Sequence, residues 1–209
     1  WENAAGQEKR YTFDQLRVAT NTYAQFLKDL GVAVGDRVCI FMDRIPDLYI
    51  SFLGILKLGA IAQPLFSAFG PESLVTRLED ASTRVMLTTM KHVRKVRKIR
   101  SELPALEHII VVDAADASKL KEGETAFVLA EAAPVERFDA FPAAQETPSV
   151  LHYTSGTTGQ PKGALHVHGS LVQQYITAKW VLDLQPDDVY WCTADPGWVT
   201  GTSYGIIGA

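Results

Sequence analysis

The apolar positions of residues 1–112 follow helical and strand periods in turn. Apolar side chains recur at helical spacing from Leu16 to Leu30, behind a capping box formed by Thr12 and Gln15. Short apolar runs and further helical segments then alternate, with glycine or proline near the boundaries. We predict helices over residues 12–30, 46–59, 71–81 and 91–100, and strands over residues 37–42, 61–65, 84–89 and 108–112.

The second half of the chain has a less regular pattern. Residues 113–147 are rich in Ala, Glu and Pro, and we expect a surface excursion there with one short helix near 124–130. A strand over 149–153, a helix over 168–182 and a strand over 189–193 are predicted to follow. Strands that alternate with helices indicate βαβ units. The sequence therefore predicts an α/β fold in which mostly parallel sheets are flanked by helices.

Composition excludes several classes of protein. With 209 residues, 47% of them hydrophobic and 21% charged, the chain can form a packed core of one or two domains. The net charge of −4 gives no general reason to expect nucleic acid or an anionic membrane as a partner. The longest apolar run, 48–56, is too short to span a bilayer. Cys39 and Cys192 lack metal-ligand spacing, and we interpret them as reduced core thiols of a cytoplasmic protein rather than a disulfide.

The two ends of the chain suggest an incomplete protein. The first residue is Trp1 rather than Met, and the glycine-rich apolar stretch 203–209 has no cap or turn to close it. We therefore expect the chain to be a fragment of a longer enzyme.

A segment rich in hydroxyls and glycines follows the predicted strand 149–153. Residues 154–163 contain four hydroxyl side chains, three glycines and one lysine. Glycines let backbone N–H groups approach an anion, hydroxyls donate to phosphate oxygens, and lysine adds a mobile positive charge. The spacing is not that of a Walker A loop, and a plain surface loop is the alternative. The candidate phosphate-binding residues are Thr154, Ser155, Gly156, Thr157, Thr158, Gly159 and Lys162.

This segment, from Tyr153 to Gly163, resembles the signature of AMP-forming acyl-CoA synthetases, which belong to the adenylate-forming superfamily. Residues 190–201, read as YWCTADPGWVTG, resemble the acetyl-CoA synthetase branch, although relatives often have another residue at Pro196. Residues 69–74 and 77–80 resemble the same branch, and only 113–147 match poorly. The resemblance implies that residues 1–209 are the N-terminal part of the AMP-binding (adenylation) domain. The rest of the large domain and the C-terminal lid domain would then be absent.

The resemblance also implies a two-step reaction with ATP, Mg²⁺ and coenzyme A. A carboxylate such as acetate attacks the α-phosphate of ATP to give acyl-AMP and pyrophosphate, and the thiol of coenzyme A then displaces AMP. The phosphate segment would bind the β- and γ-phosphates. Trp198, Val199 and Thr200 match the segment of the acyl pocket, with Thr200 where the acyl group and coenzyme A meet. For Trp198 the alternative is a buried structural aromatic.

Residues 91–100 contain six basic side chains and include the spacing R-x-x-R. By resemblance, this spacing falls where acetyl-CoA synthetases dock the nucleotide end of coenzyme A. The residues are Arg94, Lys95, Val96 and Arg97. Residues three apart share a helix face, so Arg94 and Arg97 could converge on one phosphate. A solvated cationic helix face is the alternative. Nucleic-acid binding is disfavoured because no aromatics interleave with the charges.

His152, His166 and His168 lie on either side of the phosphate segment. We interpret them as ordinary packing or loop histidines rather than as metal ligands, because the ionised carboxylate nucleophile needs no histidine base. Asp195 is left with two interpretations, organising the turn before Trp198 or lying near the ligand.

We therefore expect the chain to be part of a ligase that activates acetate or a similar short acid, with small molecules as its partners. The family's catalytic residues fall in later segments, so no catalytic residue is expected here and the chain alone is predicted to be inactive. The alternatives are a synthetase for a medium-chain or aromatic acid, and a non-catalytic nucleotide- or coenzyme-A-binding module.

Overall fold

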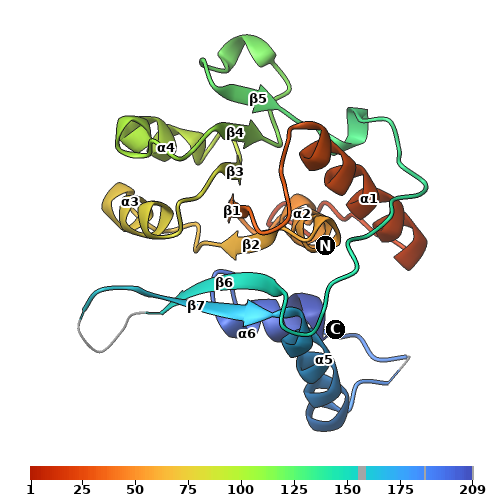
Figure 1. Ribbon diagram of the computed structural model, residues 1–209. Coiled ribbons are helices and arrows are strands. Elements are labelled where there is room, and N and C mark those ends of the chain that lie inside the picture. The colour runs from red at the N-terminus through yellow and green to blue at the C-terminus, as the bar shows by residue number, and fades with distance from the viewer. Residues whose placement is uncertain (155–158, 186, 209) are drawn as a thin grey trace.

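A seven-stranded sheet with helices on both faces organises the molecule (Figure 1). The computed structural model describes residues 1–154, 159–185 and 187–208. The strand order is β5-β4-β3-β1-β2-β6-β7, and every neighbouring pair is parallel except β6 and β7. The predicted α/β fold is confirmed. The strands are β1 (Arg37–Phe41), β2 (Ile61–Pro64), β3 (Val85–Thr88), β4 (His108–Val111), β5 (Glu124–Ala126), β6 (Pro148–Thr154) and β7 (Lys162–Val167).

The helices cover two opposite faces of this sheet. In Figure 1, α1 (Phe13–Asp29) and α2 (Pro46–Leu58) lie on one side of the strands, and α3 (Pro71–Asp80) and α4 (Val93–Ile99) lie on the other. Each face has its own core. Ile40 and Leu87 join the cluster under α1 and α2, whereas Phe41 and Met86 join the cluster under α3 and α4. Because successive strand residues point to opposite faces, and both faces are covered here, the buried strands β1 and β3 are mainly apolar; their only polar residues are Arg37 at the start of β1 and Thr88 at the end of β3.

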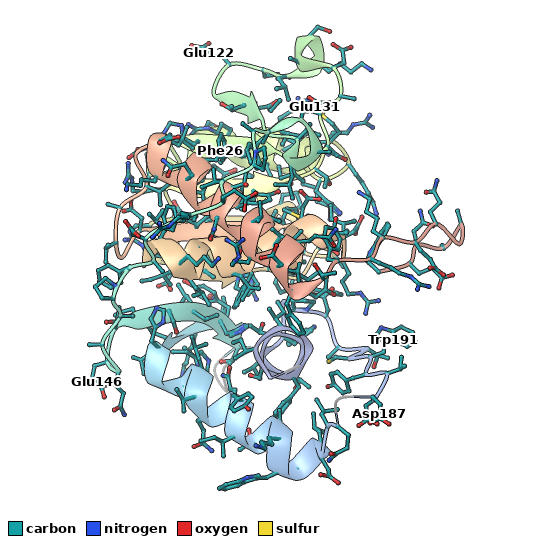
Figure 2. All side chains as sticks on the ribbon, turned by 90° about the vertical axis from the view of Figure 1, so that its right-hand side faces the viewer. Phe26, Glu122, Glu131, Glu146, Asp187 and Trp191 are labelled. Atoms are coloured by element: carbon teal, nitrogen blue, oxygen red, sulfur yellow. The ribbon has the colours of Figure 1, made fainter. Side chains whose placement is uncertain are left out.

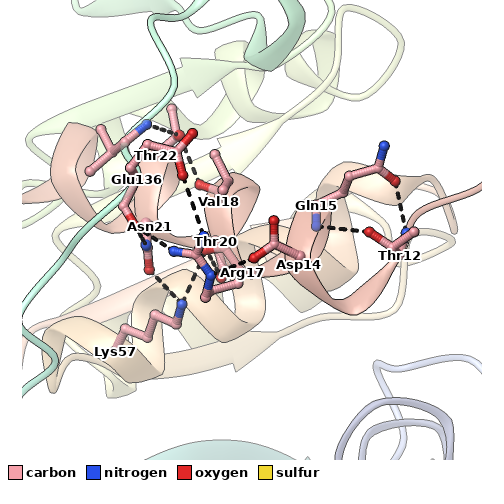
Figure 3. Close-up of polar contacts among 11 residues, drawn as sticks. Thr12, Asp14, Gln15, Arg17, Val18, Thr20, Asn21, Thr22, Lys57 and Glu136 are labelled. Atoms are coloured by element: carbon pink, nitrogen blue, oxygen red, sulfur yellow. Dashed lines mark hydrogen bonds and ion pairs between the residues drawn. The ribbon is translucent and has the colours of Figure 1, made fainter.

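Most predicted elements are confirmed to within one or two residues at each end. Helix α1 begins at the predicted capping box, in which the Gln15 N–H donates to the Thr12 hydroxyl and the Thr12 N–H donates to Gln15 (Figure 3). The predicted helix 168–182 is present as α5 (His168–Thr177), which continues as a π-helical turn over Ala178–Leu182. A short helix, α6 (Val199–Thr202), and a second π-helical turn, Ser203–Ile207, follow.

Two predicted elements are wrong. Residues 124–126 form strand β5 beside β4 instead of the start of a helix, with 3₁₀ turns at Ala117–Lys119 and Leu129–Glu131. Pairing with an apolar strand outweighs the helical preference of an alanine-rich stretch there. The predicted strand 189–193 is irregular: Val189 is fully exposed, and no strand in the described part of the chain pairs with it. An apolar run forms a strand only where a neighbour completes its hydrogen bonds.

The surface excursion after β5 is anchored along α1 and α2. Arg17 and Asn21 donate to the carbonyl oxygen of Glu136, and the backbone N–H of Val135 donates to the Thr22 hydroxyl (Figure 3). These bonds tie two backbone groups of the excursion to side chains of α1. The excursion is therefore an irregular surface segment that is fixed to the helices and leads the chain to β6.

The segment after α5 is the least covered part of the structure. Figure 2 shows Asp187 and Trp191 on this segment, away from the sheet. Its exposed apolar side chains include Trp180, Val181, Leu182, Val189, Tyr190 and Trp191, and α5 itself exposes Val172 and Tyr175. Among the described residues, no helix has the length and apolar character needed to cross a membrane. Both cysteines are free; Cys39 is fully buried in β1 and Cys192 is partly exposed.

Candidate active site

The hairpin of β6 and β7 holds the two ends of the predicted phosphate segment. Thr154 is paired with Lys162 at the open end of this ladder, and both residues are exposed. Residues 155–158, which include Ser155, Gly156, Thr157 and Thr158, lie outside the described part of the chain. Gly159 has φ +81°, a conformation that favours glycine. The hairpin was not predicted, and it makes Lys162 the first residue of a strand rather than part of the loop.

Helix α4 presents its four predicted coenzyme A residues in different ways. Arg94 is exposed to solvent. Val96 has 0% of its surface exposed, and its side chain packs in the core. It therefore offers no accessible side chain to a ligand here, and its place among the binding residues stays a prediction.

Arg97 is engaged with a carboxylate from β5. Its Nε donates to Glu124 Oε1 at 2.7 Å and its Nη2 to Oε2 at 2.6 Å, and Nη2 also donates to the Lys119 carbonyl at 3.0 Å. The Glu124 side chain is only 2% exposed. The Arg97 guanidinium, donating hydrogen bonds to this carboxyl, lowers the pKa of Glu124. Convergence of Arg94 and Arg97 on one phosphate would require Arg97 to exchange this partner.

Lys95 of α4 holds the loop that follows β2. Its Nζ donates to the carbonyl oxygens of Ser67 and Phe69, both at 3.0 Å. Loops at the carboxyl ends of parallel strands are the usual ligand-binding edge of an open α/β sheet. The loop 66–69 was not predicted as part of the site, although the family-like stretch 69–74 begins at its end.

The predicted acyl-pocket segment docks on the same loop. The rings of Trp198 and Phe66 have centroids 6.1 Å apart, and Trp198 is 49% exposed, which argues against a buried structural role. A Cβ on Gly197 would lie 2.5 Å from the backbone nitrogen of Phe66, so only glycine fits this approach. Val199 and Thr200 follow as exposed residues at the start of α6. Loop 66–69 therefore connects the basic helix with the acyl segment.

Asp195 organises the turn before Trp198. Its Oδ1 accepts the Gly197 N–H at 2.8 Å, and its carbonyl accepts the Trp198 N–H at 2.9 Å. Burial raises the pKa of the Asp195 carboxyl. The structure thus favours the first of the two interpretations that the sequence left open.

The histidines near the phosphate segment serve packing. His152 is buried in β6. Its pKa is lowered to about 4, mainly by this burial and to a smaller extent by the nearby His166. The two rings meet edge to face with centroids 5.5 Å apart. Burial also lowers the pKa of His166 and of His168. All three are therefore neutral near pH 7, a state that suits packed side chains.

Residues for a resident metal ion do not come together in the described ranges. No group of three His, Cys, Asp or Glu side chains lies close enough there to hold one.

Comparison with known proteins defines the class. The chain matches the family model of AMP-binding enzymes over residues 2–209. It is 45% identical over 206 residues to the acetyl-coenzyme A synthetase of Bacillus subtilis strain 168, covering 97% of this chain and 35% of that protein. The corresponding enzyme of Saccharophagus degradans is 38% identical over 209 residues, covering 94% and 32%.

A solved structure agrees. The crystal structure of a Brucella canis acyl-CoA synthetase superposes with a TM-score of 0.87 at 27% identity, covering 99% of this chain and 37% of that one. A mostly parallel α/β sheet with the candidate site at the carboxyl ends of its strands is an arrangement typical of ligand-binding α/β domains. The chain belongs to the AMP-binding enzyme family, and it spans about a third of the length of the relatives it matches.

Proposed function

We propose that this chain is the N-terminal part of the adenylation domain of an acetate–CoA ligase. The observation that carries the proposal is the docking of Gly197 and Trp198 on loop 66–69, which Lys95 holds from α4. This arrangement joins the segment assigned to the acid with the helix assigned to coenzyme A. The similarity to two acetyl-coenzyme A synthetases over nearly the whole chain supports the same conclusion.

The first step forms acyl-AMP. A carboxylate oxygen of the acid attacks the α-phosphorus of ATP, the bond from this phosphorus to the β-phosphate oxygen breaks, and pyrophosphate leaves. Residues 154–162 would hold the β- and γ-phosphates, where negative charge accumulates as pyrophosphate departs. Lys162, exposed at the start of β7, would contribute a positive charge to this segment.

The second step forms the thioester. The sulfur of coenzyme A attacks the acyl carbon, the carbon–oxygen bond to AMP breaks, AMP leaves, and the thiol proton passes to solvent. Arg94 is the guanidinium of α4 that faces solvent and would bind a phosphate of coenzyme A, while Lys95 positions the loop beneath it.

The size of the acid is the property that separates this proposal from its enzyme alternative. A wide indole at Trp198 in the acyl segment suits a short acid such as acetate or propionate, although one methylene changes binding by only about 1–3 kcal/mol. Pyrophosphate release by the enzyme that contains this chain should be fastest with acetate or propionate. Faster release with butyrate, octanoate or benzoate would assign it to medium-chain or aromatic acids instead.

The non-catalytic alternative concerns the chain by itself. The apolar surface after α5, which includes Trp180 and Trp191, is consistent with a face that packs against more protein. We expect the 209-residue chain alone to show no acetate-dependent ATP–pyrophosphate exchange. Exchange by the chain alone would show that the reaction needs no further segment. We further propose a cytoplasmic location, which the two free cysteines support.

A further inference from the structure

Tyr153 connects the predicted phosphate segment to helix α3. It is the last residue but one of β6, its side chain is largely buried at 6% exposure, and its hydroxyl donates to Asp80 Oδ2 at 2.6 Å. Asp80 is the last residue of α3 and is exposed to solvent. A bond to an ionised acceptor at this length is among the stronger hydrogen bonds in proteins. The strand end is therefore fixed to a helix far from it in the sequence.

The ring of Tyr153 is fixed as well as its hydroxyl. It lies opposite Gly163 of β7, where an added Cβ would be 3.5 Å from Tyr153 Cζ and 3.1 Å from Leu151 Cδ1. The absence of a side chain at Gly163 thus lets the ring lie across the hairpin. The next pair of the ladder, Thr154 and Lys162, borders the predicted phosphate segment directly.

Arg77 extends the connection to the loop after β2. It lies one turn before Asp80 on α3, and its guanidinium carbon is 4.3 Å from the centroid of the Phe69 ring and 5.9 Å from that of Tyr153. Its Nη1 donates to the Ser73 carbonyl at 2.8 Å, and its buried Nε has no hydrogen-bond partner among the described residues. One cation thus contacts both the loop held by Lys95 and the strand that enters the phosphate segment.

We propose that Asp80 and Arg77 are positioning residues that lock Tyr153 and thereby hold the neighbouring pair Thr154 and Lys162 in place during adenylation. The inference rests on the proposed function, because it assigns the phosphate segment to the first step. Burial and the bond to Asp80 raise the pKa of Tyr153, so its hydroxyl remains a donor throughout the physiological range.

The test separates the two half-reactions in the enzyme that contains this chain. Tyr153→Phe and Asp80→Ala should each reduce kcat/KM for acetate-dependent ATP–pyrophosphate exchange about 10-fold, the value expected for one hydrogen bond to a charged acceptor that water can reach. Asp80→Asn keeps an acceptor oxygen and should recover most of the loss. The double variant Tyr153→Phe/Asp80→Ala should be no worse than either single variant, since both remove one bond.

Thioester formation from supplied acetyl-AMP and coenzyme A is the second measurement. If Tyr153 and Asp80 only stabilised the fold, their variants would lose this half-reaction and adenylation to the same extent. We expect it to stay within 2-fold of wild type in all these variants. Glu79→Gln on the exposed face of α3 and Tyr175→Phe on α5 are matched controls that should change neither half-reaction. Equal loss in both half-reactions, additive losses in the double variant, or no rescue by Asp80→Asn would each overturn the proposal. Absence of acetate-dependent exchange in the wild-type enzyme would instead overturn the proposed function.

Discussion

The Arg97→Ala substitution distinguishes a structural role of this arginine from direct binding of coenzyme A. In the structure Arg97 holds Glu124, and Glu124 belongs to β5, the edge strand beside β4. If this contact is the main role of Arg97, its loss should loosen β5. If Arg97 mainly binds coenzyme A, its loss should weaken the binding of coenzyme A and leave strand β5 unchanged.

The magnitude follows from burial. Breaking a fully buried ion pair by removing one partner costs about 3–5 kcal/mol, because the other charge stays buried. Here Glu124 is 2% exposed but the Arg97 side chain is 21% exposed, so its removal opens a path for water. Glu124 also keeps the N–H of Lys121 at 2.9 Å. We therefore expect a loss of about 2 kcal/mol in the local opening free energy, which corresponds to an equilibrium constant for opening that is about 30-fold larger.

Hydrogen–deuterium exchange measures this opening directly. The informative amide is that of Phe127, which donates to the Val111 carbonyl at 3.1 Å beside the β4–β5 pair. In the enzyme that contains this chain, the Phe127 amide hydrogen should exchange about 30-fold faster after the Arg97→Ala substitution. Adding Glu124→Gln removes the stranded charge and should restore part of the protection.

Arg94→Ala is the matched control on the same helix. It should leave exchange in β5 unchanged and raise KM for coenzyme A in the thioester-forming step. A structural role of Arg97 is refuted if Arg97→Ala leaves the Phe127 amide protected, or if Arg94→Ala loosens β5 to the same extent.

Three further predictions concern the hairpin, the acyl segment and a buried histidine. Lys162→Ala should slow acetate-dependent pyrophosphate exchange and spare thioester formation from acetyl-AMP; unaffected exchange would show that the phosphate segment is misassigned. Gly197→Ala should raise KM for acetate about 10-fold or more, because the new Cβ would press on the Phe66 backbone, whereas Gly70→Ala enters open space and should not. The pKa of His152 is lowered to about 4, so the unfolded chain binds the extra proton between about pH 6.5 and 4. Stability should therefore fall by up to about 3 kcal/mol as pH decreases through this window, and urea-unfolding midpoints should lose that slope in His152→Gln.

Local sequence signals were sufficient where an element carries its own stop, start and periodicity. Helix α1 has its capping box at Thr12, and α2 begins at Pro46 and ends before Gly59. Strands β1, β3 and β4 are largely apolar runs, as expected for strands buried on both faces. These signals depend on neighbours in sequence, so they could be read without tertiary information.

The remaining features depend on partners that are distant in sequence. Strand β5 exists because β4 completes its hydrogen bonds and Arg97 neutralises Glu124, 27 residues away. The contact between Tyr153 and Asp80 spans 73 residues, and no spacing rule relates such positions. Val96 shows the converse limit: the motif R-x-x-R fixes the spacing of its arginines but leaves the residues between them on other faces of the helix.

The two cysteines differ in solvent exposure, so one of them can be labelled selectively for spectroscopy. Burial raises the pKa of the Cys39 thiol and covers it completely within β1, so alkylating reagents should not reach it in the folded protein. Cys192 is partly exposed, and its Sγ would lie 3.3 Å from a Cβ on Gly205, beside the helical turn after Thr200. A trifluoroethyl label placed on native Cys192 would thus report by fluorine NMR when the acid and the thiol enter, with no engineered attachment site in this chain.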